Sequence, residues 1–213
     1  MTAEGAGRAR RGRPPGRRSD DTRARVLDAA RARFSATGYE RTSLADIARA
    51  AGITSRALYH YVDSKPDLFA EVTTATLARM GDEVMRRVLP LADTRSRLRA
   101  LVDVLRSLHA EDPTLVAFFG VVVLQARWNP EVRERLGDDG GVPSALIRSI
   151  VSVGLEAGDV AGDVDPAGAV ALIEAVGAGI TLLAGGGGAD AFDAALDVLG
   201  RLIEGTLLDP PSA

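Results

Sequence analysis

Residues 43–61 contain two short apolar patterns of helical period separated by one glycine, and this spacing limits the possible folds more than any other feature of the chain. Ser43 and Asp46 form a capping-box start, after which apolar residues recur at helical spacing. Gly52 ends this helix, and a further short helix is predicted over residues 54–61. Two short helices joined by a tight glycine-containing turn indicate a helix-turn-helix motif.

Helical periodicity continues along the rest of the chain, with no convincing alternation of the kind that strands require. Helices are predicted from near residue 21 to Gly38 and then over residues 66–89, 94–109, 113–127, from 130, 143–158, 167–184 and about 190–208. The pattern predicts an all-α fold with an N-terminal three-helix helix-turn-helix DNA-binding domain and a C-terminal helical domain. We expect a disordered basic arm at residues 1–19, the DNA-binding domain at 20–65 and the second helical domain at 66–213.

Several kinds of site are excluded by what the chain lacks. It has no Cys and only two His, which excludes thiolate nucleophiles, disulfides and multi-histidine metal centres. The run Gly185–Gly188 lacks the Lys-Ser/Thr of a phosphate-binding loop, and residues 159–165 lack the oxygen pattern of a calcium loop. We therefore expect no enzyme activity, cofactor or metal. No apolar signal segment begins the sequence, so a cytoplasmic protein is expected.

Charge is divided unevenly along the chain. Residues 1–65 hold 14 basic and 7 acidic side chains, whereas residues 66–213 hold 12 basic and 22 acidic ones. This division indicates that the first third binds a polyanion. Within the arm, Arg11 and Arg13 belong to an Arg-Gly-Arg-Pro run that resembles an AT-hook, which predicts contact with the minor groove or with phosphates. The alternative for the arm is an inert tail.

Four runs of residues together resemble the DNA-binding domain of the tetracycline-repressor (TetR) family. They are Gly38-Tyr39-Glu40-Arg41-Thr42-Ser43-Leu44-Ala45-Asp46-Ile47-Ala48, Ala51-Gly52-Ile53-Thr54, Leu58-Tyr59-His60-Tyr61-Val62 and Ser64-Lys65-Pro66-Asp67-Leu68-Phe69. The resemblance covers about residues 20–70 and is specific, because many positions agree in register. Beyond it, only length, helical content and the order of elements match.

The second helix of the motif is predicted to read bases. A helix in the major groove presents the side chains of its first turns, which here include Arg56, whose fork can donate two hydrogen bonds to guanine. The resemblance implies base contacts at Ser55, Arg56 and His60 and a contact with the DNA backbone at Tyr59. Phosphate contacts are predicted at Thr42, Ser43, Thr54, Tyr61 and Lys65. Taken alone, His60 is an ordinary surface histidine, and its position in this helix is what makes it a candidate.

The last two predicted helices suggest self-association. Residues 167–184 are apolar nearly all round, but Glu174 in the middle and the flanking Asp residues argue against a membrane span. We predict a homodimer in which these helices and their copies form a four-helix bundle, as the resemblance also implies. The predicted interface residues are Leu172, Val176, Ile180, Phe192, Leu196, Leu199 and Ile203. The alternative is a hairpin folded into one protomer.

A small-molecule site is predicted in the middle helices. Its candidate residues are Met85, Leu105, His109, Phe118, Phe119, Val122, Gln125 and Trp128, each with a place in the core as the alternative. The resemblance implies a repressor that is released from a palindromic operator when a ligand shifts the fourth helix, and the scarcity of polar groups predicts a mainly apolar ligand. The alternative is a ligand-independent, architectural DNA-binding protein whose C-terminal part only dimerises.

Overall fold

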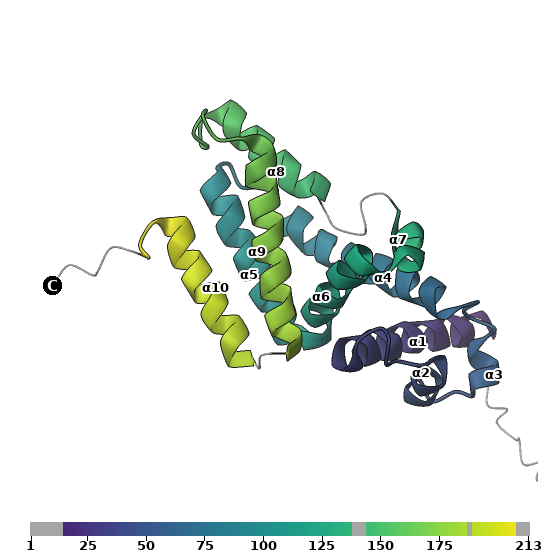
Figure 1. Ribbon diagram of the computed structural model, residues 1–213. Coiled ribbons are helices and arrows are strands. Elements are labelled where there is room, and N and C mark those ends of the chain that lie inside the picture. The colour runs from purple at the N-terminus through teal and green to yellow at the C-terminus, as the bar shows by residue number, and fades with distance from the viewer. Residues whose placement is uncertain (1–14, 138–143, 187–188, 208–213) are drawn as a thin grey trace, which may run out of the picture.

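The computed structural model of the protein describes residues 15–137, 144–186 and 189–207, and these residues form helices joined by short connections, with no strand among them (Figure 1). The helices are α1 (Pro15–Thr37), α2 (Leu44–Ala50), α3 (Ser55–Leu58), α4 (Lys65–Arg87), α5 (Thr94–Glu111), α6 (Pro113–Trp128), α7 (Pro130–Leu136), α8 (Ser144–Ala157), α9 (Pro166–Gly186) and α10 (Ala189–Glu204). The predicted all-α fold is confirmed.

Two boundaries in the N-terminal part of the chain differ from the prediction by three residues or more. Helix α1 begins at Pro15, inside the segment assigned to the arm, because proline is favoured in the first turn of a helix. Helix α3 ends at Leu58 instead of continuing to Tyr61. After Leu58, the backbone N–H groups of His60 and Tyr61 donate three residues back, at 3.2 and 2.8 Å, so the chain tightens into turns that lead to α4.

The first hydrophobic core joins the DNA-binding helices to the rest of the chain. Four aromatic rings pack against one another at its centre. The ring centre of Phe69, on α4, lies 5.2 Å from that of Phe34 on α1, 5.0 Å from that of Tyr39 and 5.2 Å from that of Phe118 on α6. Because α6 belongs to the C-terminal half in sequence, this core couples α1 and α4 to a helix beyond the DNA-binding region.

The second hydrophobic core lies among the C-terminal helices. It contains Val102 and Leu108 of α5, Leu115 of α6, and Phe192 and Leu196 of α10. Phe192 and Leu196 were predicted to lie in a dimer interface, but both have no exposed surface within one protomer. They anchor α10 on its own subunit, and the prediction is corrected for these two residues.

Helices α6 and α9 cross in close contact at Gly120. A Cβ atom added there would lie 2.9 Å from the carbonyl oxygen of Thr181, closer than packed atoms allow. Glycine at this position therefore sets the distance between the helix of the first core and the long apolar helix α9.

Helix α9 is unusually apolar for its exposure. By length and composition it is the one described helix that could cross a membrane, or one of two if the α5–α6 pair, bent by 116°, is counted as a broken span. Only 11% of its apolar window is buried within the protomer. At its start, the side chain of Asp165 caps the helix by accepting hydrogen bonds from the backbone N–H groups of Ala167 and Gly168.

Candidate DNA-binding surface and ligand cavity

The start of α2 is held by its capping residues. The Ser43 hydroxyl accepts a hydrogen bond from the backbone N–H of Asp46 at 3.1 Å and donates to the Asp46 carboxylate at 2.6 Å. That hydroxyl, together with the guanidinium of Arg49 at 2.9 Å, holds the pKa of Asp46 below its ordinary value. The first turn of α2 is therefore fixed, with its N–H groups directed outward beside Ser43.

The turn between α2 and α3 depends on one residue with a left-handed backbone conformation and on a hydrogen bond from another helix. Gly52 provides the first, with φ of +69°. The guanidinium of Arg25, on α1, provides the second by donating a hydrogen bond to the carbonyl oxygen of Ala51. Helix α1 thereby orients the motif as a unit.

Helix α3 presents one buried side and one exposed side. Thr54 caps it by accepting a hydrogen bond from the backbone N–H of Ala57 at 3.1 Å. Leu58 is fully buried, which fixes the rotation of the helix against the first core. The predicted base-contacting residues Ser55, Arg56 and His60 are all exposed, and so, at 60%, is Tyr59, for which a contact with the DNA backbone was predicted. All four side chains are therefore accessible on α3 and in the turn that follows it.

Thr42 does not lie where a phosphate contact requires it. The residue is 1% exposed, and its hydroxyl lies 2.8 Å from that of Thr37 and donates to the carbonyl oxygen of Gly38 at 2.7 Å. The hydroxyl is used in closing the α1–α2 connection, so the prediction that Thr42 binds DNA is corrected.

Lys65 lies at the start of α4 beside the motif. Its ammonium lies 4.2 Å from the centre of the Tyr39 ring and donates to the carbonyl oxygen of Glu40 at 3.3 Å. Burial raises the pKa of the Tyr39 hydroxyl to about 12, so the ring remains neutral beside the lysine. Tyr61 is half-buried, and the candidates Arg11 and Arg13 lie outside the described residues.

A cavity of about 480 Å³ lies within the C-terminal helices. Its wall is formed by Leu77, Met80, Gly81 and Val84 of α4, Leu98, Leu101, Val102, Val104 and Leu105 of α5, Phe119 of α6, Leu146 and Ile147 of α8, Leu172, Ile173, Val176, Gly177, Ile180 and Thr181 of α9, and Leu199, Leu202 and Ile203 of α10. Among the described residues, no charged side chain lines it. The Thr181 hydroxyl donates to the carbonyl oxygen of Ala178 at 2.9 Å, so this polar group of the wall is already paired.

Only two of the eight predicted ligand-binding residues, Leu105 and Phe119, lie on this wall. Phe118 and Val122 belong to the first core, because successive helix positions point about 100° apart and Phe118 therefore faces away from Phe119. The other four lie elsewhere: Met85 and Trp128 are exposed to 64% and 73%, His109 packs with its ring 4.3 Å from that of Phe192, and Gln125 accepts a hydrogen bond from Asn129. The candidate site is corrected accordingly.

The wall residues that sequence reasoning did not assign to the ligand site come mainly from α4, α5, α9 and α10. Five predicted interface residues, Leu172, Val176, Ile180, Leu199 and Ile203, line the cavity instead of lying only on an outer face. Their apolar helical spacing was visible in the sequence, but the same spacing fits a core, an interface and a cavity wall equally well.

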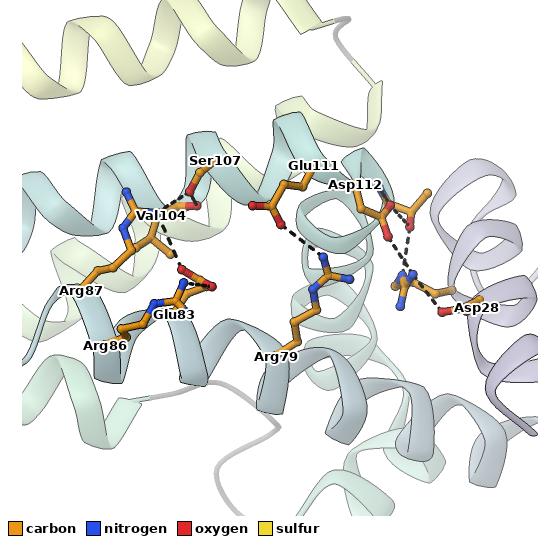
Figure 2. A network of polar contacts seen from close by, with 11 residues as sticks. Asp28, Arg79, Glu83, Arg86, Arg87, Val104, Ser107, Glu111 and Asp112 are labelled. Carbon is orange, nitrogen blue, oxygen red and sulfur yellow. Dashed lines mark hydrogen bonds and ion pairs between the residues drawn. The ribbon is translucent and has the colours of Figure 1, made fainter. Parts of the chain in front are cut away.

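Polar contacts fasten the DNA-binding helices to the cavity helices. Arg31 of α1 lies 2.8 Å from the carboxylate of Asp112 and donates to the Thr114 hydroxyl at 3.0 Å, at the start of α6. On α4, Arg79 pairs with Glu111 at 3.3 Å, and Arg87 donates to Ser107 at 2.6 Å, both on α5 (Figure 2). These contacts tie α1 and α4 to the α5–α6 corner.

The contacts of Asp112 with Arg31 and Thr114 also change the pKa of its carboxyl group. Burial raises the pKa of its carboxyl group, but hydrogen bonds from Thr114 and the charge of Arg31 outweigh burial and hold the pKa below its ordinary value. Asp112 is thus charged at neutral pH, and it also serves as the N-cap of α6 through the backbone N–H of Thr114.

A capped two-helix motif with an exposed recognition row, mounted on a helical body, defines the chain as a helix-turn-helix protein of the DNA-binding class. Residues 26–72 match the profile described as bacterial regulatory proteins, tetR family. This stretch is therefore similar to the DNA-binding region of the tetR family of bacterial regulatory proteins.

Individual relatives agree with this assignment. The chain is 30% identical to the transcriptional regulator AcrR of Shigella flexneri over 105 residues, covering 41% of this chain and 49% of AcrR. It is 37% identical to the transcriptional repressor KstR2 of Rhodococcus jostii over 90 residues, covering 39% of this chain and 44% of KstR2. These matches span about half the length of either relative. The crystal structure of a TetR transcriptional regulator from Chloroflexus aurantiacus has a TM-score of 0.70 at 27% identity, and the match covers 88% of this chain and 96% of that one.

Proposed function

We propose that the protein is a cytoplasmic repressor that binds a near-palindromic operator as a homodimer and releases it when a small apolar molecule occupies the cavity. The observation that carries the proposal is that α4 and α6 each contribute residues both to the first core and to the cavity wall. Leu68 and Phe69 of α4 pack in the core beneath the motif, while Val84 of the same helix lines the cavity. On α6, the adjacent residues Phe118 and Phe119 divide in the same way.

Base recognition is assigned to α3. Its exposed row can enter the major groove, where Arg56 donates two hydrogen bonds to guanine and Ser55, Tyr59 and His60 make neighbouring contacts. Ser43, Thr54 and Lys65 are assigned to phosphates, since each lies at the start of a helix where N–H groups and the helix dipole favour an anion.

The dimer is assigned to α9 and α10, which carry the apolar residues Leu172, Leu182, Leu183, Val198 and Leu202 on exposed surface. A second copy is favoured over a bilayer because α9 contains Glu174, one of whose carboxylate oxygens is buried without a hydrogen-bond partner among the described residues. Two copies place two recognition helices on one face of DNA, about 34 Å apart for a palindromic site.

Release by a ligand is assigned to movement of α4 and α6 relative to the motif. A molecule that fits the cavity in only one arrangement of these helices shifts the equilibrium by its difference in affinity between the two arrangements. The uncharged wall that the described residues form favours a neutral, apolar molecule, because a charge placed there would lose its hydration without gaining a partner.

The direct test is selection of bound fragments from random duplex DNA, followed by titration of the selected duplex with the full chain. We expect an inverted repeat with half-sites about one turn apart, bound by two chains. Apolar compounds that raise the thermal stability of the protein are then expected to release the duplex. No enrichment at low salt would contradict the DNA-binding role, and a complex unaffected by every stabilising compound would favour the ligand-independent alternative.

A further inference from the structure

Helix α7 belongs to the C-terminal half in sequence, but it packs against α4, whose start lies beside the DNA-binding motif (Figure 1). Val132 of α7 is fully buried in the first core, which also contains Tyr39. Burial, followed by the charge of Glu131 on α7, raises the pKa of Tyr39 to about 12. Helix α7 therefore borders the ring over which the Lys65 ammonium lies.

A chain of hydrogen bonds runs from α7 to the first turn of α4. The guanidinium Nε of Arg135 donates to one carboxylate oxygen of Asp67 at 2.6 Å, and the other oxygen accepts a hydrogen bond from the Ser64 hydroxyl. Ser64 is the N-cap of α4, and its hydroxyl accepts a hydrogen bond from the backbone N–H of Asp67 at 3.2 Å. Lys65 lies between Ser64 and Asp67 in the chain, so its backbone is held from both sides.

Arg135 is presented by a helix that is itself fixed at its start. Asn129 is both the C-cap of α6 and the N-cap of α7. Its backbone N–H donates to the carbonyl oxygen of Gln125 at 2.9 Å, and its side chain accepts a hydrogen bond from the backbone N–H of Val132 at 3.2 Å. Because Val132 is also buried, the position of Arg135 is set by packing and capping before its side chain meets α4.

Arg135 also neutralises a carboxylate close to the proposed phosphate contact. Hydrogen bonds from Ser64 and Arg135 hold the pKa of Asp67 below its ordinary value, so Asp67 is charged at neutral pH. Without Arg135, this carboxylate would attract the Lys65 ammonium and repel a phosphate. The side chains of Arg135 and Asp67 are 30% and 43% exposed, so their ion pair contributes little to stability, and its loss should affect DNA binding more than folding.

We propose that Arg135 is a positioning residue for DNA binding: through Asp67 it holds the start of α4 where the Lys65 ammonium reaches a DNA phosphate. The inference rests on the proposed function, in which Lys65 contacts a phosphate, and adds that a residue of the C-terminal half determines whether this contact forms. Arg135 acts through Lys65 and not by touching DNA itself.

The experiment measures the affinity of the full chain for the selected operator duplex at several salt concentrations. Lys65→Gln removes one phosphate contact and is expected to lower the slope of log affinity against log salt by about 0.9. Arg135→Gln is expected to lower the slope by a similar amount and to weaken binding about fivefold, with little change in melting temperature. A merely structural role would reduce the folded fraction and leave the slope unchanged.

Three further variants separate the possible causes. Arg133→Gln, which removes an exposed arginine from the same helix with the same change of charge, is the matched control and should leave affinity and slope nearly unchanged. Arg135→Lys should recover most of the affinity, because an ammonium can also pair with Asp67. In the Lys65→Gln background, Arg135→Gln should cause little further loss, because the residue through which it acts is gone.

The outcomes distinguish this inference from the proposed function. No binding to any duplex at low salt would overturn both, and an unchanged slope for Lys65→Gln would overturn the phosphate assignment and the inference together. A lower slope for Lys65→Gln but not for Arg135→Gln would overturn the inference alone.

Two other results would also overturn the positioning role. Equal effects of Arg135→Gln and Arg133→Gln would mean that net charge is the cause. A full additional loss in the Lys65→Gln background would mean that Arg135 contacts DNA directly. If Arg135→Gln fails to fold, Arg135→Met takes its place, because it keeps the aliphatic stem and loses only the guanidinium.

Discussion

At the scale of single residues, the DNA-binding surface depends on which polar groups remain free after the motif has folded. Thr42 and Ser43 are adjacent and equally polar, yet Thr42 is 1% exposed and Ser43 is exposed at the start of α2. Arg25 and Arg56 are both basic, but the first supports the turn and the second projects from α3. Residue type alone does not separate these roles: burial distinguishes Thr42 from Ser43, and the hydrogen bond to Ala51 distinguishes Arg25 from Arg56.

Arg56→Ala should weaken binding to the selected operator by about 1–3 kcal/mol and relax selectivity at one base pair in each half-site. Binding to random duplex should change little, because a base contact contributes less there. Fluorescence anisotropy with both duplexes measures the two losses. Arg148→Ala, which removes an exposed arginine from α8, is the control, and equal losses on the two duplexes would contradict base reading by Arg56.

Thr42→Val should destabilise the fold by about 1–3 kcal/mol, because it leaves buried hydrogen-bonding partners unpaired. Affinity for DNA, measured where the variant is fully folded, should be unchanged. Urea unfolding provides the measurement, and Thr74→Val on the exposed side of α4 is the control. A loss of DNA affinity without loss of stability would restore Thr42 as a phosphate contact.

At the scale of helices, α6 is the element that links the two halves. Its N-cap Asp112 pairs with Arg31 of α1, its residue Phe118 lies in the first core, and Gly120 sets its contact with α9. A shift of α6 would therefore displace α1 through the Arg31–Asp112 ion pair and α4 through the packing of Phe118 against Phe69. The family resemblance directs attention to α4, but these contacts give α6 an equal share in the coupling.

Asp112→Asn keeps an N-cap at this position while removing the charge that pairs with Arg31, so it should lower stability by about 1–2 kcal/mol at neutral pH. The native pKa of Asp112 lies below the unfolded value of 3.8. The stabilisation is therefore complete above that value and is lost as the pH falls through the native pKa. The difference in unfolding free energy between the two proteins should therefore be full at pH 7 and shrink progressively as the pH falls below 3.8.

Asp93→Asn, at the exposed N-cap of α5, is the control for this prediction, because it lacks a partner from another helix in the part of the chain that the structure describes. A difference between Asp112→Asn and the unchanged chain that is constant with pH would show that charge is not the cause.

Gly120→Ala should destabilise the fold by about 1–3 kcal/mol, because the added methyl group would lie 2.9 Å from the Thr181 carbonyl oxygen and push α6 from α9. Gly81→Ala on α4, where a Cβ meets no atom within 4 Å, should be neutral or stabilising. Thermal unfolding of both variants provides the comparison. Similar melting temperatures for the two would mean that the crossing can relax.

At the scale of the whole molecule, the excess of basic residues and the apolar cavity lie in different parts of the chain. The basic third holds the motif that faces DNA, and the acidic remainder holds a cavity with an uncharged wall of described residues. Exposed apolar residues of α9 and α10 adjoin the cavity, so the surfaces proposed for DNA binding, ligand binding and assembly lie on one continuous set of helices. Helix α6 packs against both α1 and α9, so the helices of the two regions form one continuous packed body.

Deletion of residues 1–14 removes the arginines at positions 8, 10, 11 and 13. Operator binding should weaken, and the slope of log affinity against log salt should flatten by about 0.9 for each phosphate that the arm neutralises in the intact chain. Anisotropy titrations at several salt concentrations measure this slope. The Arg56→Ala variant serves as the comparison, since a base contact should leave the slope nearly unchanged, and an unaltered slope after deletion would assign no DNA contact to the arm.

Local features were predictable from the sequence because they depend on a few neighbouring residues. The cap at Ser43 and the break at Gly52 occur where predicted, since a capping hydroxyl or a positive φ acts within one turn. The exposed row on α3 follows from the helical period once Leu58 is placed in the core.

Only the tertiary structure decided which surface each apolar residue packs against. Phe118 and Phe119, or Leu196 and Leu199, are equivalent as sequence, yet one of each pair is core and the other is cavity wall. The hydrophobic effect has no direction: periodicity specifies that a face will leave water, but not which surface it will meet. That choice is made by the crossing of helices distant in sequence, such as the one that Gly120 permits between α6 and α9.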